Sequence, residues 1–165
     1  EKTRARVHLQ RSDHDAIAVG TNTALVDDPS LTARQPDGTL YEHQPLAVVV
    51  GQRDIPGDAL IRSHPGGFLQ HHGHDLGELA SELFGRGIRS LYIEGGPTLA
   101  SAFVAENLVD EFHITMGSML LGGPTMALGD IGVSTMDEAK HLDIRSVEHS
   151  EGDVLVVARP RNREF

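Results

Sequence analysis

The sequence predicts an α/β fold in which a mixed, mostly parallel sheet is covered by helices on both faces. The apolar run at residues 46–50 is typical of a strand buried on both faces. Strand-like and helix-like segments alternate from residue 3 to residue 116, which favours strands joined by helices. Two strand-like runs flank the turn signal at residues 150–153 near the C-terminus and predict an antiparallel hairpin.

The segments before the long apolar run predict two helices around one strand. The helices are expected over residues 3–10 and 21–26, with the strand over residues 15–20. The second helix must end before Pro29, because the residue that precedes a proline disfavours the α region. Residues 55–73 have no clear periodicity, so no strand is predicted there.

The next helix signal begins at Asp75, which forms a capping box with Glu78 three positions later. Apolar residues then recur at helical spacing and are predicted to be core residues: Leu76, Leu79, Leu83 and Phe84. Gly85 ends this helix. Beyond it, apolar and polar residues alternate over residues 112–116, which predicts a half-buried strand.

The chain is organised around residues 90–100. Residues 90–93 predict a short strand buried on both faces, Gly95 allows a sharp turn, and Pro97 suits the first turn of a helix. The free backbone N–H groups at such a helix start attract anions, above all phosphates. Taken alone, this pattern favours an ordinary strand-to-helix turn, and the choice depends on the rest of the chain.

Composition restricts the classes of function. The chain has 24 acidic against 14 basic residues and a net charge of −10, so nucleic acid and anionic membranes are not expected partners. It has no cysteine, which excludes disulfides, cysteine-ligated zinc and thiol catalysis. No apolar run approaches the length that spans a membrane. A small anionic ligand remains possible in a local basic pocket.

Two separated stretches resemble the signatures of one family. The first is DAIAVGTNTALVDDPSLTAR at residues 15–34. The second combines EGGPTLA at residues 94–100 with LVDE at 108–111 and LLGG at 120–123. Together they resemble the riboflavin-pathway pyrimidine reductases, which form the C-terminal reductase domain of the bifunctional bacterial deaminase–reductase. The resemblance covers about residues 6–159 in the family's order.

The resemblance implies a dihydrofolate reductase-like three-layer fold, with one reductase domain over residues 1–165. It also implies reduction of 5-amino-6-(5-phosphoribosylamino)uracil with NADPH, in which the ring-opened ribose carbon accepts a hydride and becomes ribityl. The substrate would be a phosphorylated pyrimidine. We therefore expect a cytoplasmic homodimer that acts in riboflavin biosynthesis.

The resemblance also assigns residues to the substrate. Arg11 and Arg34 match substrate contacts, and Leu31 matches a residue that packs beside the substrate. Arginine forks suit phosphate, although each arginine could equally lie on a solvated surface. Glu94 matches a substrate-binding carboxylate, which can accept hydrogen bonds from pyrimidine N–H groups or ribose hydroxyls.

A second set of residues matches positions near NADPH. Thr23 and Asp27 belong to this set, and Arg53 follows a strand end where it could read the 2′-phosphate. Asp27 could also take part in a proton path, or it could simply end a helix before Pro29. The stretch that would cradle the cofactor phosphates comprises Gly96, Pro97, Thr98, Leu99 and Ala100.

The sequence departs from the family pattern in two places. The first strand of the family, which carries a lysine and a Ser-x-Asp-Gly turn, has no counterpart here, and residues 55–73 lack the strand expected before the Asp75 helix. Two alternatives stay open: reduction of a pterin or dihydrofolate on the same scaffold, or a nucleotide-binding module without catalysis. No metal site is predicted, since the histidines at 71, 72 and 74 fit a solvated loop.

Overall fold

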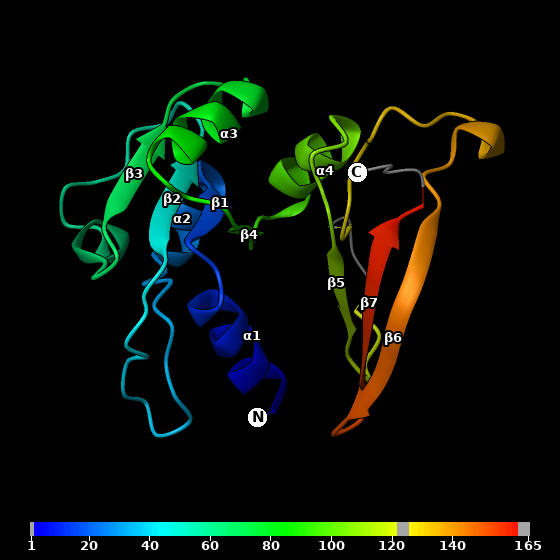
Figure 1. Ribbon diagram of the computed structural model, residues 1–165, viewed down its shortest axis with the longest axis horizontal. Helices are drawn as coiled ribbons and strands as arrows, with labels where there is room; N and C mark the ends of the chain where they lie inside the picture. The colour runs from blue at the N-terminus through cyan, green and yellow to red at the C-terminus, as the bar shows by residue number, and fades with distance from the viewer. Residues whose placement is uncertain (1, 122–125, 162–165) are drawn as a thin grey trace.

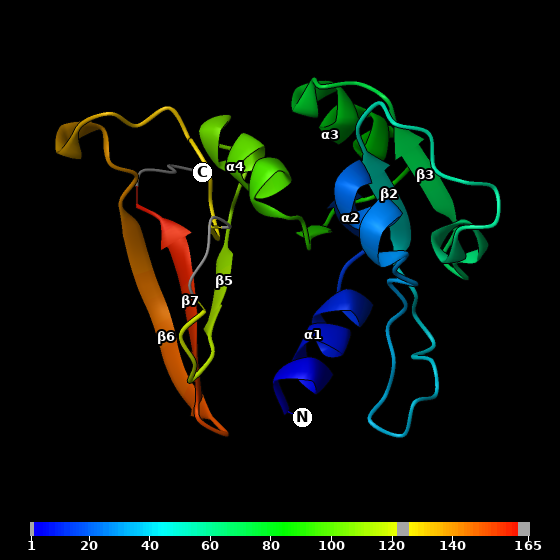
Figure 2. The same cartoon turned by 180° about the vertical axis from the view of Figure 1, so that it is seen from behind.

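The computed structural model describes residues 2–121 and 126–161. Figures 1 and 2 show two sheets that stand side by side, with helix α4 between them. The elements in chain order are α1 (Lys2–Ser12), β1 (Ala16–Gly20), α2 (Thr21–Asp27), β2 (Leu46–Val50), η1 (Leu60–Ser63), β3 (Phe68–His71), α3 (Leu76–Gly85), β4 (Leu91–Ile93), α4 (Pro97–Ala105), β5 (Phe112–Met116), η2 (Met136–Glu138), β6 (Leu142–Ser150) and β7 (Asp153–Pro160).

Parallel and antiparallel strands are divided between the two sheets. The first sheet has the order β3-β2-β1-β4, and all of its pairs are parallel. The second has the order β5-β7-β6, and both of its pairs are antiparallel. The predicted mixed topology is therefore present, and the predicted C-terminal hairpin is the β6–β7 pair.

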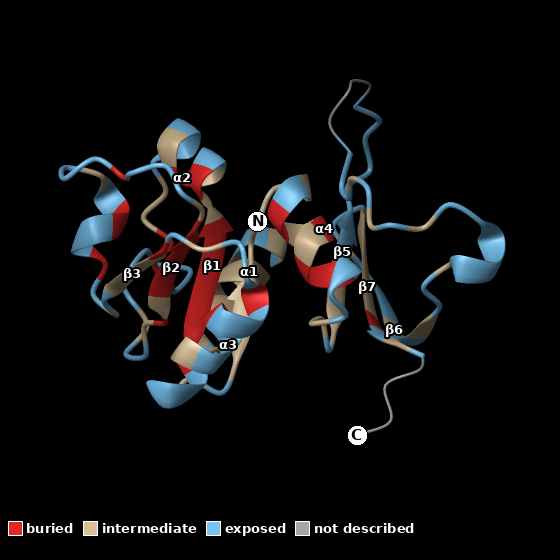
Figure 3. Ribbon diagram, turned by 90° about the horizontal axis from the view of Figure 1, so that it is seen from above, coloured by how far each residue is buried: buried red, intermediate tan, exposed pale blue. Residues whose placement is uncertain are grey.

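The core lies on both faces of β1 and β2, whose side chains point alternately to either side. On one face, Ala16, Ala18, Val48 and Val50 pack against apolar residues of α3 and α4. On the other face, Ile17, Val19, Ala47 and Val49 pack against α2, η1 and the loop around Leu31. Figure 3 shows this buried region within the parallel sheet. Continuous apolar runs, rather than alternating ones, follow from this two-sided burial.

The helix predicted after Asp75 is confirmed, together with its cap. The Asp75 carboxylate accepts a hydrogen bond from the backbone N–H of Glu78 at 2.9 Å. Leu76, Leu79 and Leu83 are buried as predicted. Phe84 is not a core residue, because its side chain is 63% exposed. It lies on the outer side of α3, and the Arg89 guanidinium covers its ring at 4.0 Å from the centroid.

The prediction that residues 55–73 contain no strand is wrong. Strand β3 pairs in parallel with β2, so that Ala47 lies opposite Phe68 and Val50 opposite His71. The strand has four residues and only the last is buried, so it carries no alternation that a pattern could reveal. Its conformation comes from pairing with β2, where Ala47 N donates to the Gly67 carbonyl at 3.0 Å.

Strand β4 also differs from the prediction. Its three residues are half-buried rather than buried on both faces, because β4 is the edge strand of its sheet and pairs with β1 alone. Asp15 fixes its start: the carboxylate accepts hydrogen bonds from the backbone N–H groups of Arg89 at 2.7 Å and Ser90 at 3.0 Å. These bonds lower the pKa of Asp15, the Arg89 bond most of all.

Among the described residues, none of the helices combines the length and the hydropathy needed to cross a bilayer. Their histidines and carboxylates also form no group of three that could hold a metal ion.

The tight entry into β3 provides a test of the observed strand. A methyl group added at Gly66 would meet the carbonyl oxygens of Pro45 and of Gln44, the latter at 2.6 Å, whereas one added at Gly57 would meet open space. We expect Gly66→Ala to lower the free energy of unfolding by about 1–3 kcal/mol, because backbone atoms must move. Gly57→Ala is the matched control, and chemical denaturation measures both. Equal effects would contradict the observed packing of β3 on the start of β2.

Candidate active site

An ion pair joins the last turn of α1 to the end of β4. Arg11 donates from Nε to Glu94 Oε1 at 2.7 Å and from Nη2 to Oε2 at 2.6 Å. This fork is bidentate, the strongest arrangement for an arginine and a carboxylate. The side chains are 15% and 21% exposed, so solvent reaches the pair only in part. Each group therefore holds the other in a fixed orientation at the carboxyl edge of the parallel sheet.

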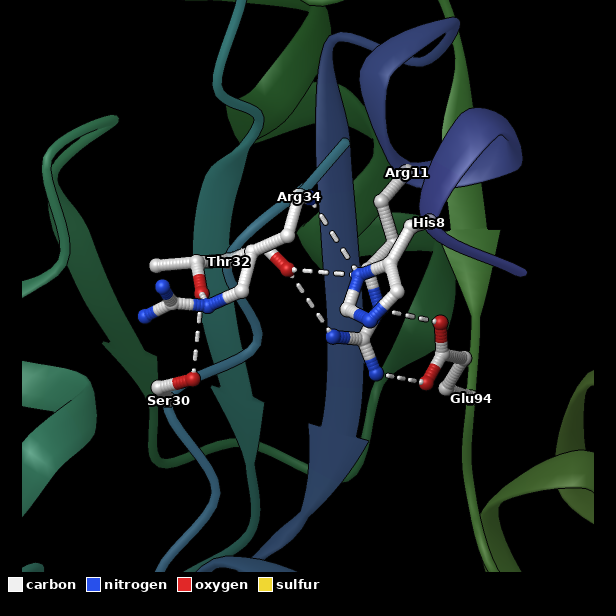
Figure 4. Close-up of polar contacts among 6 residues, drawn as sticks. All are labelled: His8, Arg11, Ser30, Thr32, Arg34 and Glu94. Atoms are coloured by element: carbon white, nitrogen blue, oxygen red, sulfur yellow. Dashed lines mark hydrogen bonds and ion pairs between the residues drawn. The ribbon is translucent and has the colours of Figure 1, made fainter. Parts of the chain in front are cut away.

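Thr32 connects further polar side chains to this pair (Figure 4). Its carbonyl accepts from Arg11 Nη1 at 3.1 Å, and His8 Nδ1 lies 3.1 Å from the same oxygen. Its hydroxyl accepts from Arg34 Nε at 3.1 Å and lies 3.1 Å from the Ser30 hydroxyl. Because Thr32 is buried, this network joins α1, the loop after α2 and the end of β4 with little freedom.

The loop that carries Thr32 is shaped by a residue with an unusual backbone angle. Leu31 has a φ of 52°, in the left-handed region that a branched side chain rarely adopts. Its side chain is 3% exposed and packs in the core beside Ile17 and Ile55. Burial of the Leu31 side chain thus holds the strained turn that directs the Thr32 carbonyl and the Arg34 backbone N–H toward α1, while the Arg34 guanidinium lies on the other side of Thr32 (Figure 4).

His64 lies beneath this loop. Its Nδ1 accepts from the backbone N–H of Gly66 at 3.0 Å, so the neutral ring carries its proton on Nε2. Nε2 is buried and has no hydrogen-bond partner among the described residues. Burial lowers the pKa of His64 most, the Leu31 carbonyl raises it, and the Arg11 charge lowers it further. His64 is therefore held neutral next to the cationic part of the site.

Tyr92 lies on β4, two positions before Glu94. Burial and, secondly, the Glu94 charge raise the pKa of its hydroxyl to about 12, against the opposing effect of Arg11. The hydroxyl is therefore protonated at neutral pH. The ring packs against His14, with a centroid distance of 5.2 Å, and edge-on against His113. Tyr92 thereby fills the space between the end of α1 and strand β5.

The start of α4 is the second part of the candidate site. Gly96 is the N-cap residue and offers no side chain to the first N–H groups, and Pro97 follows it in the first turn. Gly95 must be small, because a Cβ there would lie 2.9 Å from that of Leu99. A cavity of about 510 Å³ adjoins this turn and is lined by Pro97, Thr98, Ser101, Ala102, Met126, Gly129 and Asp130. Such a turn suits a phosphate group.

The three candidate cofactor residues lie on α2 or just after β2. Thr23, on α2, lies near the start of α4, since a Cβ added to Gly96 would be 3.8 Å from the Thr23 hydroxyl. Arg53 follows β2, is exposed, and donates from Nη2 to the Asn22 side chain at 3.2 Å. Asp27 is the last residue of α2 and is exposed. The carboxylate that fixes the end of this helix is that of Asp28, which accepts from Leu60 N at 2.9 Å.

A larger cavity of about 900 Å³ lies between α1 and the β6–β7 hairpin. It is lined by Thr3, Arg4, Val7, His8, Arg11 and Asp153. Since Arg11 and His8 also belong to the Thr32 network, this cavity borders the Arg11 side of the ion pair.

Comparison with known proteins places this arrangement in a family. The family model described as the RibD C-terminal domain matches residues 1–156. The chain belongs to the RibD C-terminal domain family.

Relatives and a solved structure agree with this assignment. The riboflavin biosynthesis protein RibD of Mycobacterium tuberculosis is 40% identical over 156 residues, which cover 94% of this chain and 45% of that protein. The 2,5-diamino-6-ribosylamino-4(3H)-pyrimidinone 5′-phosphate reductase of Archaeoglobus fulgidus is 33% identical, covering 73% of this chain and 70% of that protein. A structure of Acinetobacter baumannii RibD superposes with a TM-score of 0.82 and 25% identity over 96% of this chain and 50% of that one.

The predicted dihydrofolate reductase-like α/β class is confirmed by this superposition on a RibD reductase domain. The chain spans about half the length of the first RibD relatives that it matches.

The fold brings the residues predicted from the RibD signatures into two groups. Arg11, Leu31, Arg34 and Glu94 gather around Thr32, and Thr23 lies with residues 96–100 at the start of α4. Leu99 contributes its backbone to that turn while its side chain is buried in the core. Arg53 and Asp27 have no contact with either group among the hydrogen bonds of the described residues. Gly122 and Gly123 of the LLGG motif lie outside the described residues.

Sequence reasoning missed His8, Thr32 and His64. His8 carried an available signal, because it lies three residues before Arg11 and so on the same helical face. Thr32 acts largely through its carbonyl oxygen, which any residue possesses. His64 lies in residues 55–73, where no periodicity indicated burial, and only the tertiary fold places it beneath Leu31.

The buried neutral state of His64 predicts how stability depends on pH. Its folded pKa is lowered from the ordinary 6.5, so the unfolded chain binds the proton more readily and stability falls as pH drops through 6.5. We expect the free energy of unfolding to fall less between pH 7.5 and pH 5.5 in His64→Asn than in the wild type. Urea denaturation at the two pH values measures this difference.

The exposed His72 supplies the control for this pH experiment. His72→Asn should keep the wild-type pH dependence. The range stays above the ordinary carboxyl pKa values, so residues such as Asp15 contribute little. His8, whose pKa is also lowered, is expected to keep part of the dependence in the His64 variant. An unchanged dependence in His64→Asn would show that His64 binds its proton as readily in the folded protein as in the unfolded chain.

Proposed function

We propose that this chain reduces 5-amino-6-(5-phosphoribosylamino)uracil to the ribitylamino product with NADPH, as a step of riboflavin biosynthesis. The observation that carries the proposal is the bidentate Arg11–Glu94 pair, positioned beside Arg34 in a RibD C-terminal domain. The names of the relatives support the pathway and the class of substrate. On this proposal residues 1–165 form one reductase domain.

The polar groups around Thr32 match the functional groups of such a substrate. Glu94 is fixed by Arg11, and a carboxylate has lone pairs beyond the two in the fork that can accept from pyrimidine N–H groups or ribose hydroxyls. Arg34 is held at its Nε by Thr32 and donates from Nη1 to the Gly38 carbonyl. Its Nη2 group has no hydrogen-bond partner within residues 2–121 and 126–161, which leaves it to the ligand on this proposal. Leu31 supplies an apolar surface next to these polar groups.

The start of α4 fits a nicotinamide dinucleotide. The first backbone N–H groups of the helix, those of Thr98 and Leu99, receive no side-chain cap, and Thr98 lines the 510 Å³ cavity. The helix dipole there favours the phosphates of the cofactor. Residues 96–100 would bind these phosphates, and Thr23 would contact the cofactor beside them. The nicotinamide supplies the hydride, and the protein orients it toward the substrate carbon. Arg53 is proposed to bind the 2′-phosphate that distinguishes NADPH from NADH.

Asp27 is proposed as a catalytic residue together with Glu94. It is an exposed carboxylate at the end of α2, the helix that also carries Thr23. A carboxyl group in that position could pass a proton to the reacting substrate through water.

A homodimer is proposed from the second sheet. Large apolar side chains stay exposed on β5 and β6, namely Ile114, Met116, Ile144 and Val147. An apolar sheet face of this kind is typical of a surface that another subunit covers. The proposed location is the cytoplasm, where the phosphorylated substrate and NADPH would both be present.

The substrate proposal predicts a loss of activity on changes to Glu94 and Arg34. Glu94→Gln keeps the size of the side chain but removes the charge that Arg11 requires, and Arg34→Ala removes a cation from the site. We expect each to lower kcat/KM for the pyrimidine by on the order of 100-fold. Oxidation of NADPH, followed by absorbance with the pyrimidine and with dihydrofolate in parallel, measures this.

The exposed Glu106, at the end of α4, provides the matched control. Glu106→Gln should retain wild-type activity. Turnover with dihydrofolate alone would replace the proposed substrate while keeping the cofactor. Tight NADPH binding without any turnover would favour a nucleotide-binding module instead.

A separate experiment tests the proposed role of Arg53. Because this side chain is exposed and held by a single hydrogen bond to Asn22, its loss should leave the fold intact. We expect Arg53→Ala to raise KM for NADPH about tenfold, through loss of one charge-assisted contact, and to leave KM for NADH nearly unchanged. Steady-state kinetics with both cofactors provides the ratio. An equal rise in KM for both cofactors would show that Arg53 contacts a group that NADPH and NADH share.

A further inference from the structure

Ser101 is a polar residue in the interior of α4 whose side chain faces away from the parallel sheet. Leu99 and Phe103, two positions to either side, pack in the core against that sheet. Successive residues of a helix are rotated by about 100°, so Ser101 lies on the opposite side of α4. There it lines the 510 Å³ cavity with Thr98 and Gly129, and it is only 5% exposed. The hydroxyl is therefore buried at the wall of the cavity next to the proposed phosphate site.

The oxygen of this hydroxyl holds the opposite wall of the cavity. Ser101 Oγ accepts a hydrogen bond from the backbone N–H of Gly129 at 2.7 Å. A Cβ added to Gly129 would lie 3.6 Å from the same oxygen, so the two segments are in ordinary contact. In the part of the chain that the structure describes, no other hydrogen bond joins α4 to residues 126–132. The Ser101 oxygen thus fixes where this wall lies relative to the start of α4.

The hydrogen of the same hydroxyl has no acceptor among the described residues. A serine inside a helix usually donates to the carbonyl four positions earlier, as Ser81 Oγ does to the Gly77 carbonyl at 2.9 Å in α3. Ser101 makes no such bond to the Pro97 carbonyl. A buried donor without an acceptor is unfavourable, so this hydrogen is suited to a ligand oxygen in the cavity.

The described lining of the cavity offers an anion neutral donors rather than cations. It contains no basic residue, and Asp130 is its one charged member. Asp130 is exposed, and its Oδ1 accepts from the backbone N–H of Gly132 at 2.8 Å. A phosphate group there depends on the backbone N–H groups at the start of α4 and on the Ser101 hydroxyl. The Asp130 charge opposes a phosphate, so removal of this charge should strengthen phosphate binding.

We infer that Ser101 binds the cofactor: its oxygen positions Gly129, and its hydrogen is donated to a phosphate oxygen of the nicotinamide dinucleotide. The inference rests on the proposed function, because that function supplies the dinucleotide. It adds to residues 96–100 a side-chain contact one turn after Thr98 on the same face of α4. A hydroxyl that accepts from an N–H group is polarised and donates more strongly, so the two hydrogen bonds strengthen each other.

The first test separates cofactor binding from the chemical step. We expect Ser101→Ala to raise KM for NADPH about tenfold, because one charge-assisted hydrogen bond to phosphate is lost. KM for the pyrimidine and kcat at saturating NADPH should stay near the wild-type values. Ser101→Thr keeps the hydroxyl and should retain most of the affinity, whereas Asp130→Asn should lower KM for NADPH. Steady-state kinetics with each substrate varied in turn measures these values.

Lys140→Met is the matched control. Lys140 Nζ donates to the Asn107 side chain at 2.6 Å and so ties the chain beyond residue 132 to the end of α4, outside the cavity. The loss of this hydrogen bond should leave KM for NADPH unchanged. Equal rises in KM for Ser101→Ala and Lys140→Met would show that Ser101 is only a structural tie, and would overturn the phosphate contact.

Direct binding separates this inference from the proposed function, because it needs no turnover. NADPH is titrated by fluorescence, and ADP and adenosine are titrated by calorimetry. Ser101→Ala should bind ADP more weakly than the wild type and adenosine equally well. That result in a protein that reduces no pyrimidine would support the contact and overturn the proposed reaction. Wild-type affinity of Ser101→Ala for NADPH and ADP, in a protein that does reduce the pyrimidine, would overturn the contact and leave the reaction intact.

Discussion

The bidentate pair between Arg11 and Glu94 is the interaction on which the site depends. It joins the first helix to the end of an edge strand that has only three residues and one partner strand. A partly buried pair of this kind adds little net stability, because desolvation offsets most of the attraction. The pair instead fixes the orientation of both side chains, because either charge would lose most of its solvation if it moved away from the other. The Thr32 carbonyl, which accepts from the same guanidinium, extends this orientation to the loop that carries Arg34.

Much of the parallel core could be predicted from the sequence, because its constraints are local. Continuous apolar runs in β1 and β2 reflect burial on both faces, and the Asp75 cap identifies the start of α3. Strand β3 could not be predicted, since its backbone conformation is imposed by β2 and its four side chains show no pattern. Phe84 follows Leu76 by eight residues, which is a helical spacing, yet it lies at the border of the apolar face of α3 and its ring stays exposed.

For the candidate site, the sequence identifies several residues but not the contacts between them. The signatures identify Arg11, Arg34 and Glu94, but each appears there as an independent contact to a ligand. That Arg11 binds Glu94 is a property of the folded chain, because the two residues are 83 positions apart. The hub of the network is a carbonyl oxygen of Thr32, for which side-chain chemistry provides no signal. The strain at Leu31 that aims this carbonyl likewise depends on core packing and not on a turn-forming residue.

Helical periodicity explains how an acidic chain can present a basic cavity. Residues of α1 that face the hairpin bind its carboxylates, as Arg6 does with Glu148, and this attraction holds the helix against the second sheet. The residues one step around the helix, Arg4 and His8, are thereby left to line the space between the two. The basic residues of α1 therefore differ in role: Arg6 binds the hairpin, whereas Arg4 and His8 line the cavity.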